Sequence, residues 1–203
     1  MLAILTGDII NSRKYKTGIW LDRLKDVLSY YGKEPEDWEI FRGDSFQLKV
    51  AKESALKAAL VIKAFIKQDR GLDVRIAIGI GEIEYKAPKI TESTGTAFIY
   101  SGQCFDNLKK YSMAIKTPFA EFDEEINLYI ILALLTINSW TPNMAKIVAV
   151  SILHENLSQK EIAQMLNKSQ SSISESKKRA GYEEIMKMEK RYRKLVQKYF
   201  NQI

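Results

Sequence analysis

The hydrophobic pattern of the chain changes near residue 120, and this change constrains the fold more than any other feature. Up to that point, short apolar runs typical of strands alternate with stretches of helical spacing, in the order β-α-β-β-α-β-α-β. Beyond it, only helical spacing occurs. We therefore predict an α+β domain over residues 1–120, a linking helix over 121–140 and an all-α module over 141–203.

The first domain is expected to build one sheet from short strands. The run 74–83 alternates between larger apolar residues and a second set, Arg75, Ala77, Gly79 and Gly81. This second set should share one face of the strand. Because most of its side chains are small or absent, another group can approach that face closely. The order of elements predicts a ferredoxin-like sheet with helices on one face. Strands are expected at 2–10, 40–41, 46–50, 74–83 and 113–116, and helices at 18–31, 52–68 and 103–111.

Cys104 is the only cysteine and His154 the only histidine of the chain. These counts exclude a disulfide framework, a thiolate metal cluster and a structural zinc site within one protomer, and they disfavour a Ser-His-Asp triad. Cys104 is expected to be a buried small side chain, and His154 to interact with the end of a helix. A single cysteine suits a reducing compartment, so we expect a cytoplasmic protein in which any metal is held by carboxylates.

Charge is unevenly distributed along the chain, whose formal net charge is +6. Residues 1–120 hold 19 Lys and Arg against 15 Asp and Glu, residues 121–140 hold none against 4, and residues 141–203 hold 12 against 6. A basic C-terminal module indicates a polyanionic partner. No segment has the roughly 20 apolar residues that span a bilayer, so no membrane partner is expected.

Two acidic residues should meet at one end of the predicted sheet. Asp8 ends the first strand, and Asp44 lies at the tip of the central hairpin. Carboxylates on adjacent strand ends repel unless a cation or a proton lies between them. Mg²⁺ or Mn²⁺ bound through carboxylates commonly bridges to phosphates, so the pair predicts a nucleotide ligand. The alternative is structural, because Asp in a hairpin turn or after a strand often only caps the backbone.

Four segments carry a resemblance to known proteins: TGDII (6–10), RGDSF (42–46), VRIAIGIGE (74–82) and YSG (100–102). They resemble the palm-type fold of nucleotide cyclases and GGDEF domains, and over nearly the whole chain the SatD family, in which such a domain precedes a helix-turn-helix. The resemblance implies that Asp8 and Asp44 hold the metal. It also implies that Ser12 and Arg13, in the turn after the first strand, face the phosphates.

The chain departs from active cyclases at two positions aligned on Gly102. Where those enzymes carry an Asn and an Arg, this sequence has Asp106 and Lys110. A carboxylate repels a triphosphate, and Lys lacks the bidentate fork of Arg. Lys110 and Arg42 remain candidates for phosphate contact, whereas Arg75 is expected to pair with a nearby carboxylate.

A helix-turn-helix is predicted after residue 141. Thr141 and Pro142 suit the start of a helix, and the segment SQKE (158–161) forms a capping box that starts another. Ser169 should cap a third helix after the turn 167–169. A helix, a three-residue turn and a second helix are typical of DNA-reading proteins.

The third helix supplies the candidate DNA-binding residues. Its polar N-terminal side chains would reach base edges, and its basic C-terminal side chains would contact phosphates. The alternative is a plain helical bundle with a solvated charged face. The candidates are Gln170, Ser171, Ser172, Ser174, Lys177, Lys178 and Arg179.

The leading hypothesis from the sequence is a DNA-binding transcriptional regulator with a cyclase-like domain that senses a nucleotide and a metal. A final helix with apolar spacing over 185–199 suggests a homodimer, as a palindromic operator would require. The alternatives are a metal-dependent nucleotidyl cyclase or transferase with a C-terminal targeting or dimerisation module, and a scaffold that binds neither ligand nor DNA.

Overall fold

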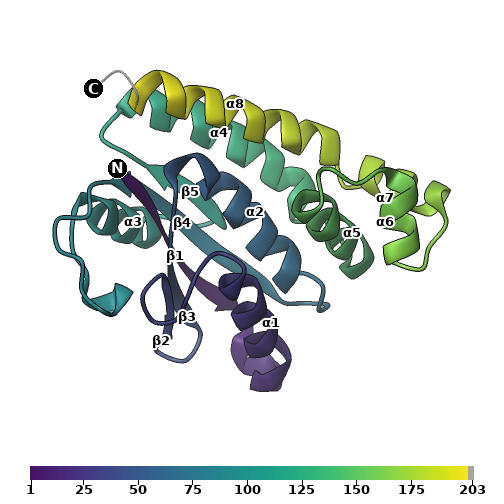
Figure 1. Ribbon diagram of the computed structural model, residues 1–203, viewed down its shortest axis with the longest axis horizontal. Helices are drawn as coiled ribbons and strands as arrows, with labels where there is room; N and C mark the ends of the chain where they lie inside the picture. Colours follow the sequence, from purple (N-terminus) through teal and green to yellow (C-terminus); the bar gives the residue numbers. More distant parts are fainter. Residues whose placement is uncertain (201–203) are drawn as a thin grey trace.

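The computed structural model describes residues 1–200, so the last three residues of the module predicted over 141–203 lie outside it. Within this range the protein is α+β, with a five-stranded mixed sheet and eight α-helices (Figure 1). The elements are β1 (Leu2–Ile10), α1 (Thr17–Ser29), β2 (Trp38–Phe41), β3 (Ser45–Val50), α2 (Ala55–Ile66), β4 (Asp73–Gly81), α3 (Thr96–Asp106), β5 (Met113–Lys116), α4 (Ala120–Ile137), α5 (Pro142–Leu153), α6 (Gln159–Met165), α7 (Gln170–Arg179) and α8 (Tyr182–Phe200).

The strands lie in the order β2-β3-β1-β4-β5. All neighbours are antiparallel except β4 and β5, which are parallel and joined through α3. Strand β1 is central, and its residue Asp8 lies opposite Ser45 of β3 and opposite Arg75 of β4. The predicted alternation of strands and helices is therefore confirmed, and the strands that carry Asp8 and the Asp44 hairpin are neighbours.

Helix α3 lies on the opposite face of the sheet from α1 and α2, so the prediction of helices on one face only is wrong (Figure 1). The physical reason is the glycine face of β4. A Cβ added at Gly79 would lie 2.2 Å from the backbone nitrogen of Ser101 and 2.3 Å from the carbonyl oxygen of Ala97. The group that approaches this face is thus the backbone of α3, which begins at Thr96 rather than at the predicted residue 103.

The main hydrophobic core lies on the other face of the sheet. It joins side chains of all five strands to buried faces of α1, α2, α4, α5 and α8. Tyr192 of α8 is fully buried and donates a hydrogen bond to the carbonyl oxygen of Lys52, which ties the end of the chain to its first half. No helix within residues 1–200 is long and apolar enough to cross a membrane.

Helices α6 and α7 are packed differently, beside the main body rather than in it (Figure 1). They close a separate small cluster with α5, made of Ile147, Ile162, Ala163 and Ile173. Small Ala163 is buried between the two helices, which allows them to approach closely. Leu166, at the end of α6, is partly buried against this cluster.

Candidate functional site

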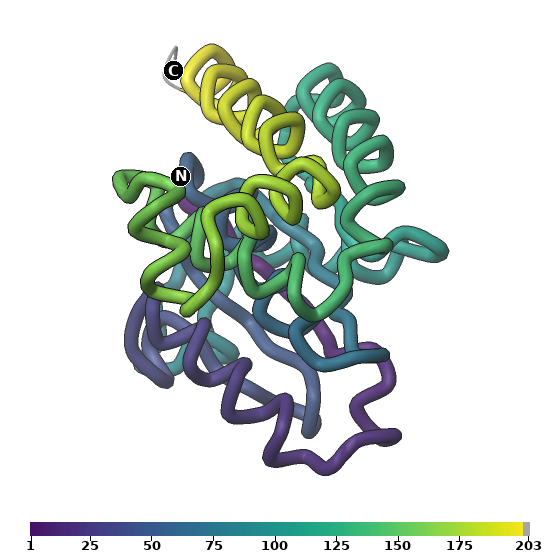
Figure 2. The backbone as a smooth tube through the Cα atoms, turned by 90° about the vertical axis from the view of Figure 1, so that its right-hand side faces the viewer, coloured from purple at the N-terminus to yellow at the C-terminus, as the bar shows by residue number. Residues whose placement is uncertain are grey.

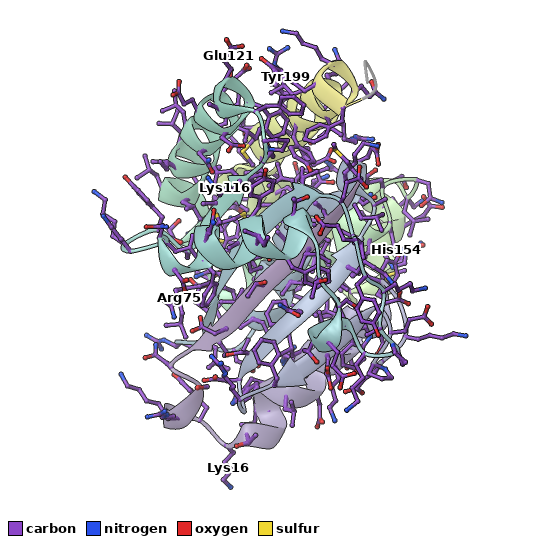
Figure 3. The ribbon with its side chains drawn as sticks, turned by 90° about the vertical axis from the view of Figure 1, so that its left-hand side faces the viewer. Lys16, Arg75, Lys116, Glu121, His154 and Tyr199 are labelled. Atoms are coloured by element: carbon purple, nitrogen blue, oxygen red, sulfur yellow. The ribbon has the colours of Figure 1, made fainter. Side chains whose placement is uncertain are left out.

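Asp8 is held by an arginine from the neighbouring strand. The Nε of Arg75 donates to Oδ1 of Asp8 at 2.9 Å, and its Nη2 donates to Oδ2 at 2.5 Å. Such a bidentate pair is among the stronger hydrogen-bonded arrangements in proteins. The guanidinium also lies 5.1 Å from the ring centre of Phe105, at the end of α3. Figure 3 labels Arg75 on this face of the molecule.

Asp44 is engaged from the turn that follows β1. The Oγ of buried Ser12 donates to Oδ2 of Asp44 at 2.5 Å, and the Ile9 nitrogen donates to the Asp44 carbonyl at 3.1 Å. Hydrogen bonding to Asp8 raises the pKa of Arg75, and the charge of Asp44 raises it further. The two predicted carboxylates therefore lie at the same end of the sheet, where Asp8 is paired with Arg75 and Asp44 with Ser12.

This donor set does not fit a Mg²⁺ or Mn²⁺ site as it stands. Both oxygens of Asp8 already accept hydrogen bonds from Arg75, and one oxygen of Asp44 accepts from Ser12. Within residues 1–200, no group of three or more His, Cys, Asp or Glu side chains is placed to hold a metal ion. The expectation that Arg75 pairs with a nearby carboxylate is confirmed, and its partner is Asp8, which lies opposite it in the β1–β4 register.

The other candidate phosphate ligands lie on loops at the same end of the sheet. Arg13 is exposed in the turn after β1, and Arg42 is exposed in the hairpin turn, where it has a left-handed φ of 51°. Lys110 is exposed in the segment that leads into β5, and its Nζ lies 5.1 Å from the ring centre of Tyr111. Three exposed cations thus surround the end of the sheet that holds the carboxylates.

Two residues that the sequence singled out are structural. Cys104 is buried between α3 and the sheet, and burial raises the pKa of its thiol to about 12, which leaves it protonated and unreactive. His154 follows α5, where its nitrogen donates to the Val150 carbonyl at 3.0 Å (labelled in Figure 3).

The second candidate site is the connection between α6 and α7. Ser158 and Glu161 form the predicted capping box at the start of α6, with the Ser158 nitrogen 2.7 Å from Oε2 of Glu161. Ser169 caps α7 by accepting from the Ser172 nitrogen at 3.2 Å. Asn167, with a left-handed φ of 50°, makes the turn between the helices. Side-chain caps therefore define where each of the two helices begins.

The outer face of α7 is polar at its start and basic at its end. Gln170, Ser171 and Ser174 are exposed, Ser172 is half-buried beside the cap, and Lys178 and Arg179 are exposed at the last turn.

Lys177 differs from the rest of the predicted DNA-binding set. Only 13% of its side chain is exposed, and its Nζ lies 3.9 Å from the ring centre of Tyr182. Burial lowers the pKa of Lys177. The prediction that Lys177 contacts phosphates is therefore corrected: its ammonium packs between α7 and α8 instead. The sequence could not show this, because the contact depends on the turn that places Tyr182.

No family model, curated protein or solved structure matches the chain. The functional interpretation is therefore based on the geometry of the two candidate sites.

Proposed function

We propose that this protein binds double-stranded DNA through α7 and acts as a transcriptional regulator whose sheet domain senses a nucleotide. The observation that carries the proposal is the outward face of α7, which is capped by Ser169 and combines exposed polar side chains with Lys178 and Arg179. Two helices joined by a short turn and backed by a small core are the arrangement of the helix-turn-helix.

The dimensions and chemistry of α7 suit the major groove. An α-helix with its side chains is about 10–12 Å across, and the groove of B-DNA is about 12 Å wide. Gln170 has the amide that pairs with adenine, and Ser171 and Ser174 can donate to or accept from a base edge. Lys178 and Arg179, one to two turns further on, would contact phosphates and set the register.

For the sheet domain we propose a ferredoxin-like, nucleotide-cyclase-like palm, as in the SatD family. The strand order β2-β3-β1-β4-β5 and the antiparallel pairing of β1 with both β3 and β4 support this. The carboxylates Asp8 and Asp44 at the shared strand ends support it further.

The proposed nucleotide would bind through Arg13, Arg42 and Lys110, because Asp8 is already paired with Arg75. A metal-dependent cyclase or transferase would need Arg75 to release Asp8, and no observation favours that reaction. Titration calorimetry with purine and pyrimidine triphosphates, with and without Mg²⁺, tests the proposal. We expect heat without Mg²⁺ that is lost in the R13A/R42A variant. The absence of heat under both conditions would remove nucleotide sensing.

DNA binding is tested by the fluorescence anisotropy of a labelled mixed-sequence duplex over a range of salt concentrations. The K178A/R179A variant should bind more weakly, and its salt slope should fall by about 2, since each phosphate contact contributes about 0.9. A matched control, K190A/K194A, removes the same charge from exposed positions of α8 and should keep the wild-type slope. A wild-type protein that does not bind the duplex, or equal losses in both variants, would refute the proposal.

A further inference from the structure

Helix α4 has two apolar faces, and only one of them is covered. Its inner face, which includes Phe122, Ile130 and Ile137, is buried in the main core. On the outer face, Leu128 and Leu135 are 54% and 74% exposed. Exposed leucines one to two turns apart on one helix form a continuous apolar stripe rather than scattered surface residues.

This outer face has the spacing of a helix-pairing seam. Glu124, Leu128, Ile131 and Leu135 follow one another at intervals of four, three and four residues. That repeat is the one by which α-helices pack side by side along their length. Leu132, 56% exposed, widens the stripe toward α8.

A groove adjoins the stripe where α4 and α8 run side by side in opposite directions (Figures 1 and 2). It has a volume of about 620 Å³, and its apolar floor includes Leu132, Ala133, Ile185 and Met188. Its rim is basic, because four cations and one carboxylate line it. These residues are Lys178, Arg179, Lys187, Arg191 and Glu184.

Two of the rim cations have no acidic partner among the residues that the structure describes. Arg191 binds Glu125 at 2.9 Å, and Arg179 lies 4.0 Å from Glu175. Lys178 and Lys187 are exposed and form no ion pair within residues 1–200. The C-terminal end of α4 is thus bordered by unpaired positive charge.

The N-terminal end of the same helix has the opposite charge. Residues 121–140 contain four acidic and no basic residues. Asp123 is bound by Thr117 and Glu125 by Arg191, whereas Glu124 is exposed in line with the leucines. Glu121, labelled in Figure 3, accepts a hydrogen bond from Tyr199 at this end.

We infer that the outer face of α4 pairs with α4 of a second copy of this chain, antiparallel and about a two-fold axis. A two-fold interface needs one patch that is complementary to itself. Antiparallel pairing packs Leu128 of each copy against Leu135 of the other and brings Glu124 of each copy to the basic end of the other, on the side of Lys187. The opposed helix dipoles favour the same arrangement. The inference does not depend on DNA binding.

Sedimentation equilibrium of the full chain, without DNA, tests the apolar part of the interface. The wild type should be a dimer, and L128D/L135D should weaken it by about 100-fold or more in Kd, because a buried unpaired carboxylate costs several factors of ten. The control I99D/M165D places the same charges at exposed apolar positions of α3 and α6 and should remain dimeric. Circular dichroism verifies that each variant is folded. A monomeric wild type, or a dimer that L128D/L135D leaves intact, would overturn the inference.

Charge reversal tests the antiparallel orientation. E124K and K187E should each weaken the homodimer, because each places like charges across the interface. Mixing the two variants should restore a heterodimer, since both ends of the interface then join opposite charges. The control K190E makes the same charge change outside the groove and should not rescue E124K. Equal association in all mixtures would overturn the antiparallel pairing.

Discussion

The sheet with its packed helices and the pair α6–α7 bury their apolar side chains in separate clusters. The first cluster gathers residues from β1 to α8 and includes contacts between distant parts of the chain, such as Tyr192 with Lys52. The second consists of a few residues of α5, α6 and α7, supplemented by helix caps. Because local stability follows buried contacts, α6–α7 should be able to open while the sheet stays folded. The proposed DNA-binding surface therefore lies on the region that is stabilised mainly by local contacts.

The largest effect is expected on the sheet side, at Lys63 of α2. Its side chain is 0% exposed, and its Nζ binds Asp73 at 2.7 Å, Ser112 at 2.8 Å and the Val74 carbonyl at 3.2 Å. Lys63→Ala should lower the free energy of unfolding by about 3–5 kcal/mol, because it leaves a cavity in the core and removes the donor to Ser112 and to the Val74 carbonyl, whereas Asp73 keeps Lys67. Urea denaturation measures this. Lys57→Ala, which removes only a partly exposed pair with Glu155, should cost under about 1 kcal/mol.

Truncating a core residue of the small α5–α6–α7 cluster should destabilise mainly α6 and α7. Ile173 of α7 is fully buried in the small cluster with Ile162 and Ala163. Ile173→Ala should cost about 2–5 kcal/mol through the cavity it leaves. Hydrogen exchange should show faster exchange of the amides of α6 and α7, with those of β1 and β4 unchanged. A uniform loss of protection across the protein would show that the two clusters unfold together, which would contradict separate opening of α6–α7.

Local signals predicted the α6–α7 region well. The capping box at Ser158 and Glu161 and the cap at Ser169 depend on residues three positions apart. Such interactions can be read from the sequence, because helix periodicity and capping act over three or four residues.

The features that the sequence did not predict depend on contacts between residues far apart in the chain. The placement of α3 depends on the close approach of Gly79 in β4 to the backbone of Ser101 in α3. The buried residues of α3, such as Ala97 and Ser101, are small, so the sequence of this helix lacks a strong apolar pattern. The pairing of Arg75 with Asp8 depends on the register of β4 against β1. At this end of the sheet, the two acidic positions were therefore predictable from motifs, whereas the pairing of Asp8 with Arg75 is set by tertiary structure.

A smaller effect is expected at the cap of α6. Ser158→Ala should cost about 1 kcal/mol, because it removes the acceptor for the Glu161 nitrogen. Hydrogen exchange of the first turn of α6 measures the loss. Ser174→Ala, at an exposed position within α7, provides the control and should be neutral or slightly stabilising. If both substitutions had the same effect, the caps would not be what stabilises this region.

The smallest effect is expected at a charge buried beside the large core. The side chain of Glu189 in α8 is 0% exposed; its Oε2 accepts from Arg193 at 3.0 Å, and its Oε1 has no hydrogen-bond partner within residues 1–200. Burial raises the pKa of Glu189. The folded state therefore holds this proton more tightly than the unfolded chain. Its contribution to stability is fully present below the ordinary carboxyl pKa and is lost as the pH rises through the raised one.

Glu189→Gln should remove that loss, because the amide carries no charge and its oxygen can still accept from Arg193. We expect a gain of about 0.5–1 kcal/mol in the free energy of unfolding at neutral pH, and no gain in acid where Glu189 is already protonated. Urea denaturation at a series of pH values measures the difference. Glu84→Gln, at an exposed position, should leave the pH dependence unchanged. A loss of stability at neutral pH would instead mean that the ion pair with Arg193 outweighs the desolvation of its carboxylate, and that the large core gains stability from this charge.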